Sequence, residues 1–588
     1  MKKIVSTLLI LVFAYTLLFS STACAAEGPV ITDREMTFYL NSLEDVRTYP
    51  VYFMGDSDVP YFSLADWAKL MPYLMKTYTK KGQDISFDLS FSMEGDIGIL
   101  ARKDGAPYPA LFDCAEDTIY FLDYDAFQRP DEDRLLIDAL TVDSPHSAED
   151  VKYFQRTAGS YERYGTDLKL DLGSYGIDLV TDGENCYVPM QTLADFLLSL
   201  QYMNVFYNGE AFYIVLSGTF GETYSQQYTE IGEQFHAVKP RERSAAMAQF
   251  SCAELCLAMD RLYGLKEAHG FDSFETLAKQ AGCYEALRGT DSYLADKALY
   301  EIITLHLDDG HSNFLNCSPL AMSGSSLDAF LRLMKESGLG SQYTTTVSNQ
   351  RLYEGARAAY YPDGVPAYEE VGNTAYITFD HFADAPEGVD YYLTAPTAQA
   401  EDTIGIMLYA YSQIMREGSP VENVVLDLSC NGGGSADTAV FVLSAFIGQG
   451  RISLQNTMTG AIATGVYQVD MNLDRQFDEQ DLGLTGKNLF CLTSPMSFSC
   501  GNMVPNVFKN TGSVVLLGRT SGGGSCSVLP MTTAYGSEFS ISSPWRLAFA
   551  KNGSFYDIDR GVDPDFSLAR VSTFYDRQTL TDYVNALY

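Results

Sequence analysis

The chain has 588 residues, of which 46% are hydrophobic and 13% aromatic, a composition typical of folded globular proteins rather than disordered ones. This length exceeds what one hydrophobic core supports, so we expect roughly two to four domains. The net charge of −37 argues against nucleic acid and anionic membrane surfaces as partners, because like charges repel.

The N-terminus has the layout of a secretory signal peptide over residues 1–25. Two lysines precede an apolar run from Val5 to Phe19, and an A-x-A cleavage motif surrounds Cys24. The run is short for the roughly 20 residues that span a bilayer, so we expect an exported, extracellular or envelope-associated protein. Cys24 also fits a lipoprotein site, which leaves free secretion and lipid anchoring both open.

Residues 27–240 are rich in strand-forming residues and contain an internal repeat. The pattern V-P-x-x-[S/T]-L-A-D-aromatic occurs at residues 59–67 and again at residues 188–196. In each copy a proline turn leads through Ser63 or Thr192, the expected N-cap, into a helix. The second copy is followed by an Asn-Gly dipeptide, which is typical of a β-hairpin turn. We therefore expect a duplicated small α+β module.

Residues 241–350 form the next predicted region, a helical lead-in with apolar residues at three- and four-residue steps. A helical stretch over residues 293–307 is expected to end at Gly310, because glycine is the preferred residue just past a helix. His311 then lies directly after this helix. A histidine there can interact with the helix dipole as a C-cap, or it can serve as a general base.

Residues 351–588 alternate between strand and helix patterns, which predicts an α/β fold. The apolar run 424–428 is typical of a buried parallel strand and leads into three glycines at 432–434. Such a turn lets backbone amides approach a ligand or an oxyanion. Phosphate binding is the alternative, but the Lys-Ser/Thr pair of a P-loop does not follow.

Ser499 lies at a predicted turn between a strand and a helix, within the stretch from Leu492 to Asn510. Helix N-terminal amides and the positive end of the helix dipole gather at such a turn. This setting suits a nucleophile whose attack creates an oxyanion. The alternative is that Ser499 only caps the helix, since serine is among the preferred N-cap residues.

Several sequence blocks in this half of the chain occur in a characteristic order. They are LDDGH at 307–311, VLDLSCNGGG at 425–434, SCGN at 499–502, the glycine block at 518–524 and GVDPD at 561–565. Together they resemble the serine peptidase family that includes C-terminal processing peptidases, the tricorn core protease and interphotoreceptor retinoid-binding protein. The resemblance covers about residues 241 to 570. It implies a ClpP/crotonase-like catalytic core and peptide-bond hydrolysis through an acyl-enzyme.

The resemblance also implies roles for individual residues. Ser499 takes the position of the nucleophile, and the backbone amides of Gly433 and Cys500 take those of the oxyanion donors. The processing-peptidase branch uses a lysine base at the position that is Gly523 here. A Ser-Lys dyad is therefore not expected.

The tricorn-like branch uses a histidine base, and His311 matches it. The acidic partner of that histidine falls at Ile558 in this chain, so Asp559, the next residue, is the expected replacement. The glutamate that follows the nucleophile in the family is Asn502 here. With these changes, the resemblance implies a catalytic set of Ser499, His311 and Asp559, without a cofactor.

An acidic loop at residues 470–481 has the ligand spacing of an EF-hand or dockerin calcium site. The candidate ligands are Asp470, Asn472, Asp474, Asp478 and Asp481. Arg475 stands where such loops have glycine, and a solvated acidic loop is the alternative. A calcium ion here would be structural.

These expectations combine into an exported serine endopeptidase whose partners are protein or peptide substrates. The alternative is a catalytically inactive ligand- or peptide-binding protein on the same fold. The missing lysine and the altered acidic position favour that alternative, whereas His311 and Ser499 favour the enzyme.

Overall fold

The computed structural model describes residues 30–587 apart from residues 76–77, 81–82, 86, 104, 106–107, 130–134, 140–152, 217–225, 323–325 and 387. The predicted signal peptide and Cys24 lie outside the described residues. Among the helices that the structure describes, none is both long and apolar enough to cross a membrane.

The sheet that leads to the predicted nucleophile has the strand order β17-β18-β19-β22-β23-β28. Its strands are β17 (Tyr368–Val371), β18 (Thr374–Thr378), β19 (Asn423–Asp427), β22 (Asn488–Thr493), β23 (Val515–Gly518) and β28 (Phe566–Ser567). Neighbours from β18 to β28 pair in parallel, and only the edge strand β17 is antiparallel. The carboxyl ends of the parallel strands therefore meet at one edge, where the glycine turn after β19 and the Ser499 turn after β22 come together.

The helices that follow these strands confirm the predicted α/β order. They are α13 (Thr403–Ile414) after β18, α14 (Ala436–Ile447) after β19 and α15 (Cys500–Thr511) after β22. Helix α14 packs on strands of a second sheet, and α15 contacts both sheets. This second sheet consists of β10 (Phe154–Arg163), β21 (Ile462–Val469), β20 (Gly450–Asn456), β25 (Glu538–Ala548), β16 (Asn313–Asn316) and β24 (Cys526–Thr532).

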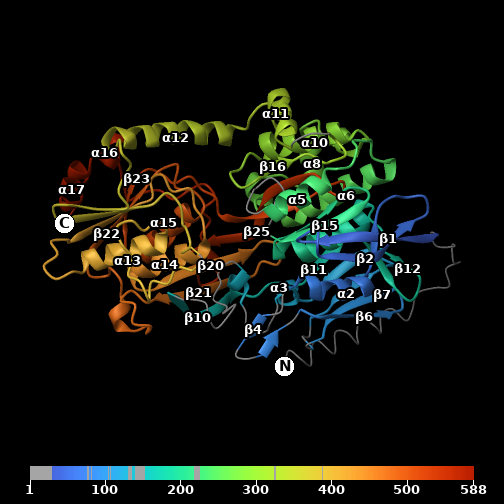
Figure 1. The fold of residues 1–588 in the computed structure, drawn as a ribbon, viewed down its shortest axis with the longest axis horizontal. Helices are drawn as coiled ribbons and strands as arrows, with labels where there is room; N and C mark the ends of the chain where they lie inside the picture. Colours follow the sequence, from blue (N-terminus) through green and yellow to red (C-terminus); the bar gives the residue numbers. More distant parts are fainter. Residues whose placement is uncertain are drawn as a thin grey trace.

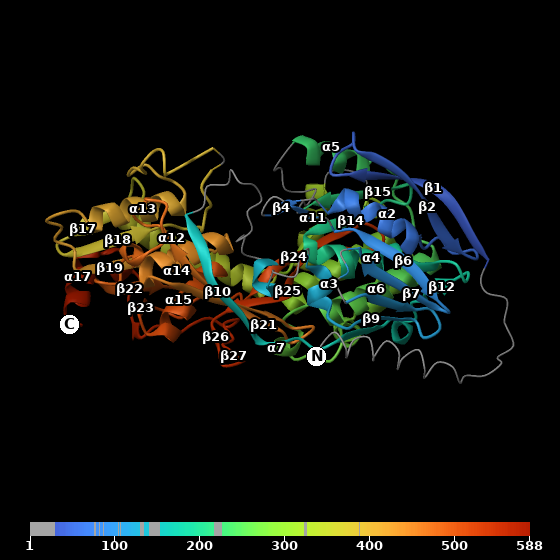
Figure 2. The ribbon, with the colours of Figure 1, turned by 90° about the horizontal axis from the view of Figure 1, so that it is seen from below.

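The second sheet joins the three predicted regions of the chain. Strand β10 comes from the N-terminal region and β16 from the helical lead-in, and both pair with strands of the C-terminal region. Figure 1 shows two lobes, with the long strand β25 extending from one toward the other. In the view of Figure 2, β10 lies beside the lobe that carries α13 and α14.

The other lobe is built on two antiparallel-rich sheets and a cap of helices. The larger sheet contains β12 (Val180–Thr181), β13 (Cys186–Pro189), β3 (Tyr61–Ser63), β2 (Val46–Met54), β1 (Ile31–Leu40), β15 (Ala211–Leu216) and β14 (Met203–Tyr207). The smaller contains β11 (Leu168–Asp171), β9 (Thr118–Phe121), β8 (Ala110–Asp113), β7 (Ile97–Arg102) and β6 (Leu89–Glu94).

Short hairpins are β4 (Tyr78–Lys80) with β5 (Gln83–Ile85), and β26 (Ala550–Lys551) with β27 (Ser554–Phe555). The remaining α-helices are α2 (Leu64–Leu74), α3 (Tyr124–Gln128), α4 (Met190–Leu193), α5 (Gln226–Phe235), α6 (Ala245–Leu262), α7 (Lys266–His269), α8 (Phe274–Gln280), α9 (Tyr284–Arg288), α10 (Ser292–Glu301), α11 (Ser326–Ser337), α12 (Ser341–Tyr360), α16 (Ser572–Tyr575) and α17 (Arg577–Asn585).

The two copies of the sequence repeat meet in the larger sheet, where β3 of the first copy pairs antiparallel with β13 of the second. Ser63 caps α2 as predicted, since its hydroxyl accepts the Asp66 amide at 3.0 Å. The N-cap prediction for Thr192 is wrong, because α4 begins two residues earlier, at Met190. The Thr192 hydroxyl instead donates to the buried Glu254 carboxylate at 2.6 Å. A buried carboxylate needs such a partner, because an unsatisfied buried acceptor costs free energy. The hairpin between β14 and β15 is confirmed.

The prediction that the helical stretch 293–307 ends at Gly310 is also wrong. This stretch ends in a π-helical segment, Ile302–Leu307, and Asp308 follows it in the left-handed conformation with φ 45° and ψ 46°. The Asp308 carboxylate accepts the amides of Ser341 and Gln342 at the start of α12. These bonds compensate for the left-handed backbone, so that the chain turns here without glycine.

Candidate active site

Ser499 occupies a strained turn between β22 and α15. Its backbone has φ 55° and ψ −121°, a region that non-glycine residues seldom adopt and that costs on the order of 1–3 kcal/mol. The turn is held because Ser499 N–H donates to the Gly523 carbonyl at 3.0 Å and its own carbonyl accepts the amides of Asn502 and Met503. The side chain makes no capping hydrogen bond. Ser499 therefore occupies the N-cap position of α15 without capping it through its side chain.

The glycine turn after β19 lies directly against Ser499. A Cβ placed on Gly433 would lie 2.7 Å from the Ser499 Cβ and 3.2 Å from its Oγ, so only glycine fits this position. Gly433 N–H donates to the Asn431 side chain at 2.9 Å, and Asn431 in turn donates to the Phe379 carbonyl at 3.0 Å. Cys500 is the first residue of α15, and amides in a first helical turn have no acceptor within the helix. Both predicted oxyanion donors thus adjoin the predicted nucleophile.

His311 is buried, with 7% of its surface exposed, and lies against the residue before the nucleophile. Its ring centroid is 4.8 Å from that of Phe498. The Phe498 ring also fills the space over Gly310 and Gly524, where an added Cβ would lie 2.4 Å and 2.6 Å from its Cζ. Within the described residues, no hydrogen bond joins the His311 ring to the Ser499 hydroxyl. In many enzymes the hydrogen bond between nucleophile and base forms only once substrate is bound.

The backbone of His311 is fixed at both ends. Asp309 Oδ1 accepts the amides of His311 and Ser312 at 3.0 and 2.9 Å, and the Ser540 hydroxyl of β25 donates to the His311 carbonyl at 3.0 Å. Because the preceding helix ends at Leu307, His311 is not its C-cap. The alternative role that the sequence left open is therefore wrong.

Burial lowers the pKa of the His311 imidazole, while the negative charges of Asp309 and Asp559 raise it in part. The ring is thus predominantly neutral near pH 7, which is the form that a general base requires. The two carboxylates would stabilise the imidazolium once the ring has taken a proton.

The segment that carries the expected acid follows β27. Ile558, at the family's acidic position, is buried with 1% of its surface exposed, so no carboxylate faces the site from there. The neighbouring Asp559 carboxylate lies 3.8 Å from Nε2 of His269. Asn502 holds this segment by donating to the Ile558 carbonyl at 2.9 Å, and it accepts the Ser521 hydroxyl at 2.6 Å.

The acidic loop at 470–481 uses its carboxylates to bind its own backbone. Asp470 accepts the amides of Asp474 and Arg475 at 3.2 and 2.7 Å, and Asp481 accepts those of Met471, Asn472 and Asp478 at 2.8, 3.4 and 3.1 Å. Across the described part of the chain, no group of three or more His, Cys, Asp or Glu side chains converges as a metal site. Calcium binding stays a prediction.

Sequence reasoning missed several residues of this region. Asp309 and Asn431 lie inside the sequence blocks at 307–311 and 425–434, and Phe498 directly precedes Ser499. Their proximity to the predicted site could therefore have been inferred from the sequence. The proximity of His269 and Tyr263 could not be inferred, because the lead-in helices carry no pattern that connects them with residues 498–559.

Among known protein families, residues 373–568 match the model of Peptidase family S41, which makes this part of the chain a peptidase domain. Over these residues the match confirms the resemblance to a serine peptidase family that the sequence blocks carried. A curated Chlamydia pneumoniae protein is 32% identical over 102 residues, which are 17% of this chain and 16% of that protein. The chain thus matches about a sixth of the length of this curated relative.

The chain is also similar to parts of solved structures that are distant from it in sequence. The photosystem II D1 C-terminal processing protease is 17% identical, over 33% of this chain and 42% of that chain, with a TM-score of 0.25. A lipoprotein from Streptococcus agalactiae is 12% identical, over 60% and 99% of the two chains, with a TM-score of 0.34. Mature CPAF in complex with lactacystin is 11% identical, over 58% and 97%, with a TM-score of 0.36.

Proposed function

We propose that this chain is an exported serine endopeptidase with a ClpP/crotonase-like core, which hydrolyses peptide bonds through an acyl-enzyme on Ser499. The observation that carries the proposal is the strained, uncapped Ser499 beside Gly433 at the N-terminus of α15. Backbone strain concentrates at functional sites, and the same strand-turn-helix setting exposes the nucleophile in other hydrolases.

The reaction follows from the position of each group. Ser499 Oγ attacks the scissile carbonyl carbon while His311 takes the hydroxyl proton. The carbonyl oxygen becomes an oxyanion, which accepts a hydrogen bond from the amide of Cys500. The amide of Gly433 can join it only by leaving the Asn431 Oδ1 atom to which it donates. His311 then gives its proton to the leaving amine. A water molecule attacks the acyl-enzyme in the same way, releasing the acid and restoring Ser499.

Asp559 is proposed as the acidic member of the set. Its charge favours the protonated form of His311, although no hydrogen bond joins the two side chains among the described residues. Its action would be electrostatic at this stage, and substrate binding would have to bring Ser499 Oγ and the His311 ring into contact past Phe498.

The test is hydrolysis of a peptide library together with labelling of the serine by a fluorophosphonate. We expect the wild type to cleave and to be labelled at Ser499, and Ser499→Ala and His311→Ala to lose cleavage while remaining folded. His306→Ala and Ser412→Ala are matched controls, because both side chains are exposed. Cleavage by Ser499→Ala would refute the proposal.

A second candidate is a ligand- or peptide-binding protein without activity. The buried Ile558 at the acidic position and the unpaired geometry of Ser499 and His311 favour it. It predicts that the wild type neither cleaves the library nor reacts with the fluorophosphonate, with or without calcium, yet retains peptides from the library on a binding column.

Export and anchoring at Cys24 form a separate part of the proposal. Mass spectrometry of the mature protein from the native host distinguishes them, since a lipid-anchored form would begin at Cys24 and carry acyl chains. A mature protein that still carries residues 1–23 would refute export through this signal.

A further inference from the structure

A chain of polar side chains connects the two acidic residues that act on His311. Asp559 Oδ2 lies 3.8 Å from His269 Nε2, and His269 Nδ1 lies 3.0 Å from the Tyr263 hydroxyl. The same hydroxyl donates to Asp309 Oδ2 at 2.8 Å. Tyr263 and His269 come from the end of α6 and from α7, so residues far apart in sequence meet beside the proposed base.

The position of each proton in this chain follows from donor counting. Burial and the charge of Asp309 raise the pKa of Tyr263 well above its ordinary value, so the phenol keeps its single proton. An ionised Asp309 can only accept, and that proton therefore points to it. Tyr263 must then accept from His269, which assigns a hydrogen to Nδ1. Nε2 faces the Asp559 carboxylate and attracts it only when this nitrogen also carries a hydrogen, so the imidazolium form of His269 is the one that holds Asp559.

Both ends of the chain act on the same imidazole. Asp309 holds the backbone of His311 through Oδ1 and its charge reaches the ring, as does that of Asp559. Tyr263 occupies the other oxygen of Asp309, and His269 faces Asp559. Two side chains that do not touch the reacting atoms thus contact the second oxygen of Asp309 and the carboxylate of Asp559.

The scaffold keeps this chain in place. The Tyr263 ring is buried and stacks on Phe271, two residues after His269, at a centroid distance of 5.9 Å. The next residue, Gly264, donates its amide to the Ser542 carbonyl of β25 at 2.9 Å. The Ser542 hydroxyl donates to Asp309 Oδ1 at 2.8 Å, which closes the arrangement around that carboxylate.

We propose that His269 and Tyr263 are positioning residues of this site, which hold Asp559 and Asp309 where their charges stabilise the His311 imidazolium during catalysis. This inference rests on the proposed function, because it assigns the two residues a role in that reaction. Neither residue belongs to the sequence blocks that carry the family resemblance.

The test compares kcat and KM of the wild type with those of His269→Ala, His269→Asn and Tyr263→Phe. We expect His269→Ala and Tyr263→Phe to lower kcat about tenfold or more with KM unchanged, since substrate contacts are retained. His269→Asn keeps an amide donor near the position of Nδ1, so it should regain part of the rate. Fluorophosphonate labelling of Ser499 should slow in parallel, and His306→Ala serves as the control.

A double-variant comparison separates positioning from a general structural role. If His269 acts through Asp559, Asp559→Asn combined with His269→Ala should lower kcat no further than the stronger single variant, because both changes break one chain. Three outcomes would overturn this inference but not the proposed function. They are losses of kcat that multiply in the double variant, a kcat within twofold of wild type in His269→Ala and Tyr263→Phe, and losses of kcat that follow a lowered unfolding midpoint. A wild type that neither cleaves nor labels would overturn the proposed function and this inference with it.

Discussion

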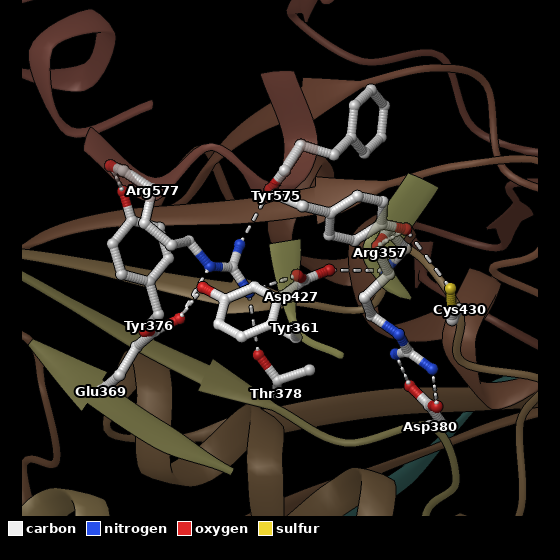
Figure 3. A network of polar contacts seen from close by, with 12 residues as sticks. Arg357, Tyr361, Glu369, Tyr376, Thr378, Asp380, Asp427, Cys430, Tyr575 and Arg577 are labelled. Carbon is white, nitrogen blue, oxygen red and sulfur yellow. Dashed lines mark hydrogen bonds and ion pairs between the residues drawn. The ribbon is translucent and has the colours of Figure 1, made fainter. Parts of the chain in front are cut away.

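Replacing Arg577 by methionine should destabilise the strand that leads to the glycine turn. Figure 3 shows the Arg577 guanidinium beside Asp427, the last residue of β19. Arg577 Nη2 donates to Asp427 Oδ2 at 2.8 Å, and the two side chains are only 3% and 1% exposed. Nε donates to Glu369 Oε1 at 3.0 Å, and the cation lies 4.4 Å from the Tyr376 ring centroid.

The expected magnitude follows from this burial. Removing one partner of a buried ion pair leaves an uncompensated charge and typically costs about 3–5 kcal/mol. Arg577→Met leaves the Asp427 carboxylate with the amide of Ser429, which donates to Oδ1 at 3.0 Å. The same network offers a matched control, because Arg357 pairs with Asp380 through two hydrogen bonds of 2.7 and 2.6 Å while the Asp380 side chain is 48% exposed. Exposed pairs contribute at most about 1 kcal/mol, so Arg357→Met should change little.

Hydrogen–deuterium exchange of the β19 peptide measures this difference directly. Arg577→Met should accelerate exchange there by about 10²-fold or more, which corresponds to about 3 kcal/mol, and Arg357→Met by less than about tenfold. The double variant Asp427→Asn with Arg577→Met should recover part of the loss, because no charge is left unpaired. Equal exchange in Arg577→Met and Arg357→Met would refute the reasoning.

Three further predictions concern pH and metal binding. Burial raises the pKa of Glu254 to about 7 and that of its neighbour Asp195 well above its ordinary value. The protonated carboxyl groups therefore add to the free energy of unfolding below pH 4.5, and this contribution, about 3 kcal/mol for Glu254, is lost as the pH rises toward 7. Glu254→Gln should therefore flatten the fall in melting temperature between pH 5 and 8, and an unchanged slope would contradict this origin. Because the charge of Asp559 raises the pKa of His311, Asp559→Asn should move the acidic limb of the kcat/KM profile to lower pH, and a shift to higher pH would contradict the assignment. If the acidic loop binds calcium, millimolar calcium should raise the melting temperature of the wild type but not of Asp470→Asn, and equal responses would exclude this site.

The sequence by itself determined the local chemistry of the core. A buried apolar run, a glycine turn and a serine before an amphipathic helix are short-range patterns, and β19, β22 and α15 formed where these patterns predicted them. The ordered blocks also predicted the resemblance to a serine peptidase family, and residues 373–568 match the model of Peptidase family S41. Where short-range signals compete, the prediction was wrong: Thr192 bonds to Glu254 instead of capping its helix, and the lead-in helix ends at Leu307.

Only the tertiary structure decided which residues surround His311. Its neighbours Tyr263, His269 and Phe498 are separated from it by tens to hundreds of residues, and no periodicity relates them. Their contacts exist because β16 of the lead-in pairs with β25 of the core, which brings the helical lead-in against the Ser499 turn. Strand pairing between distant segments depends on the packing of the whole core, and a local sequence pattern cannot encode it.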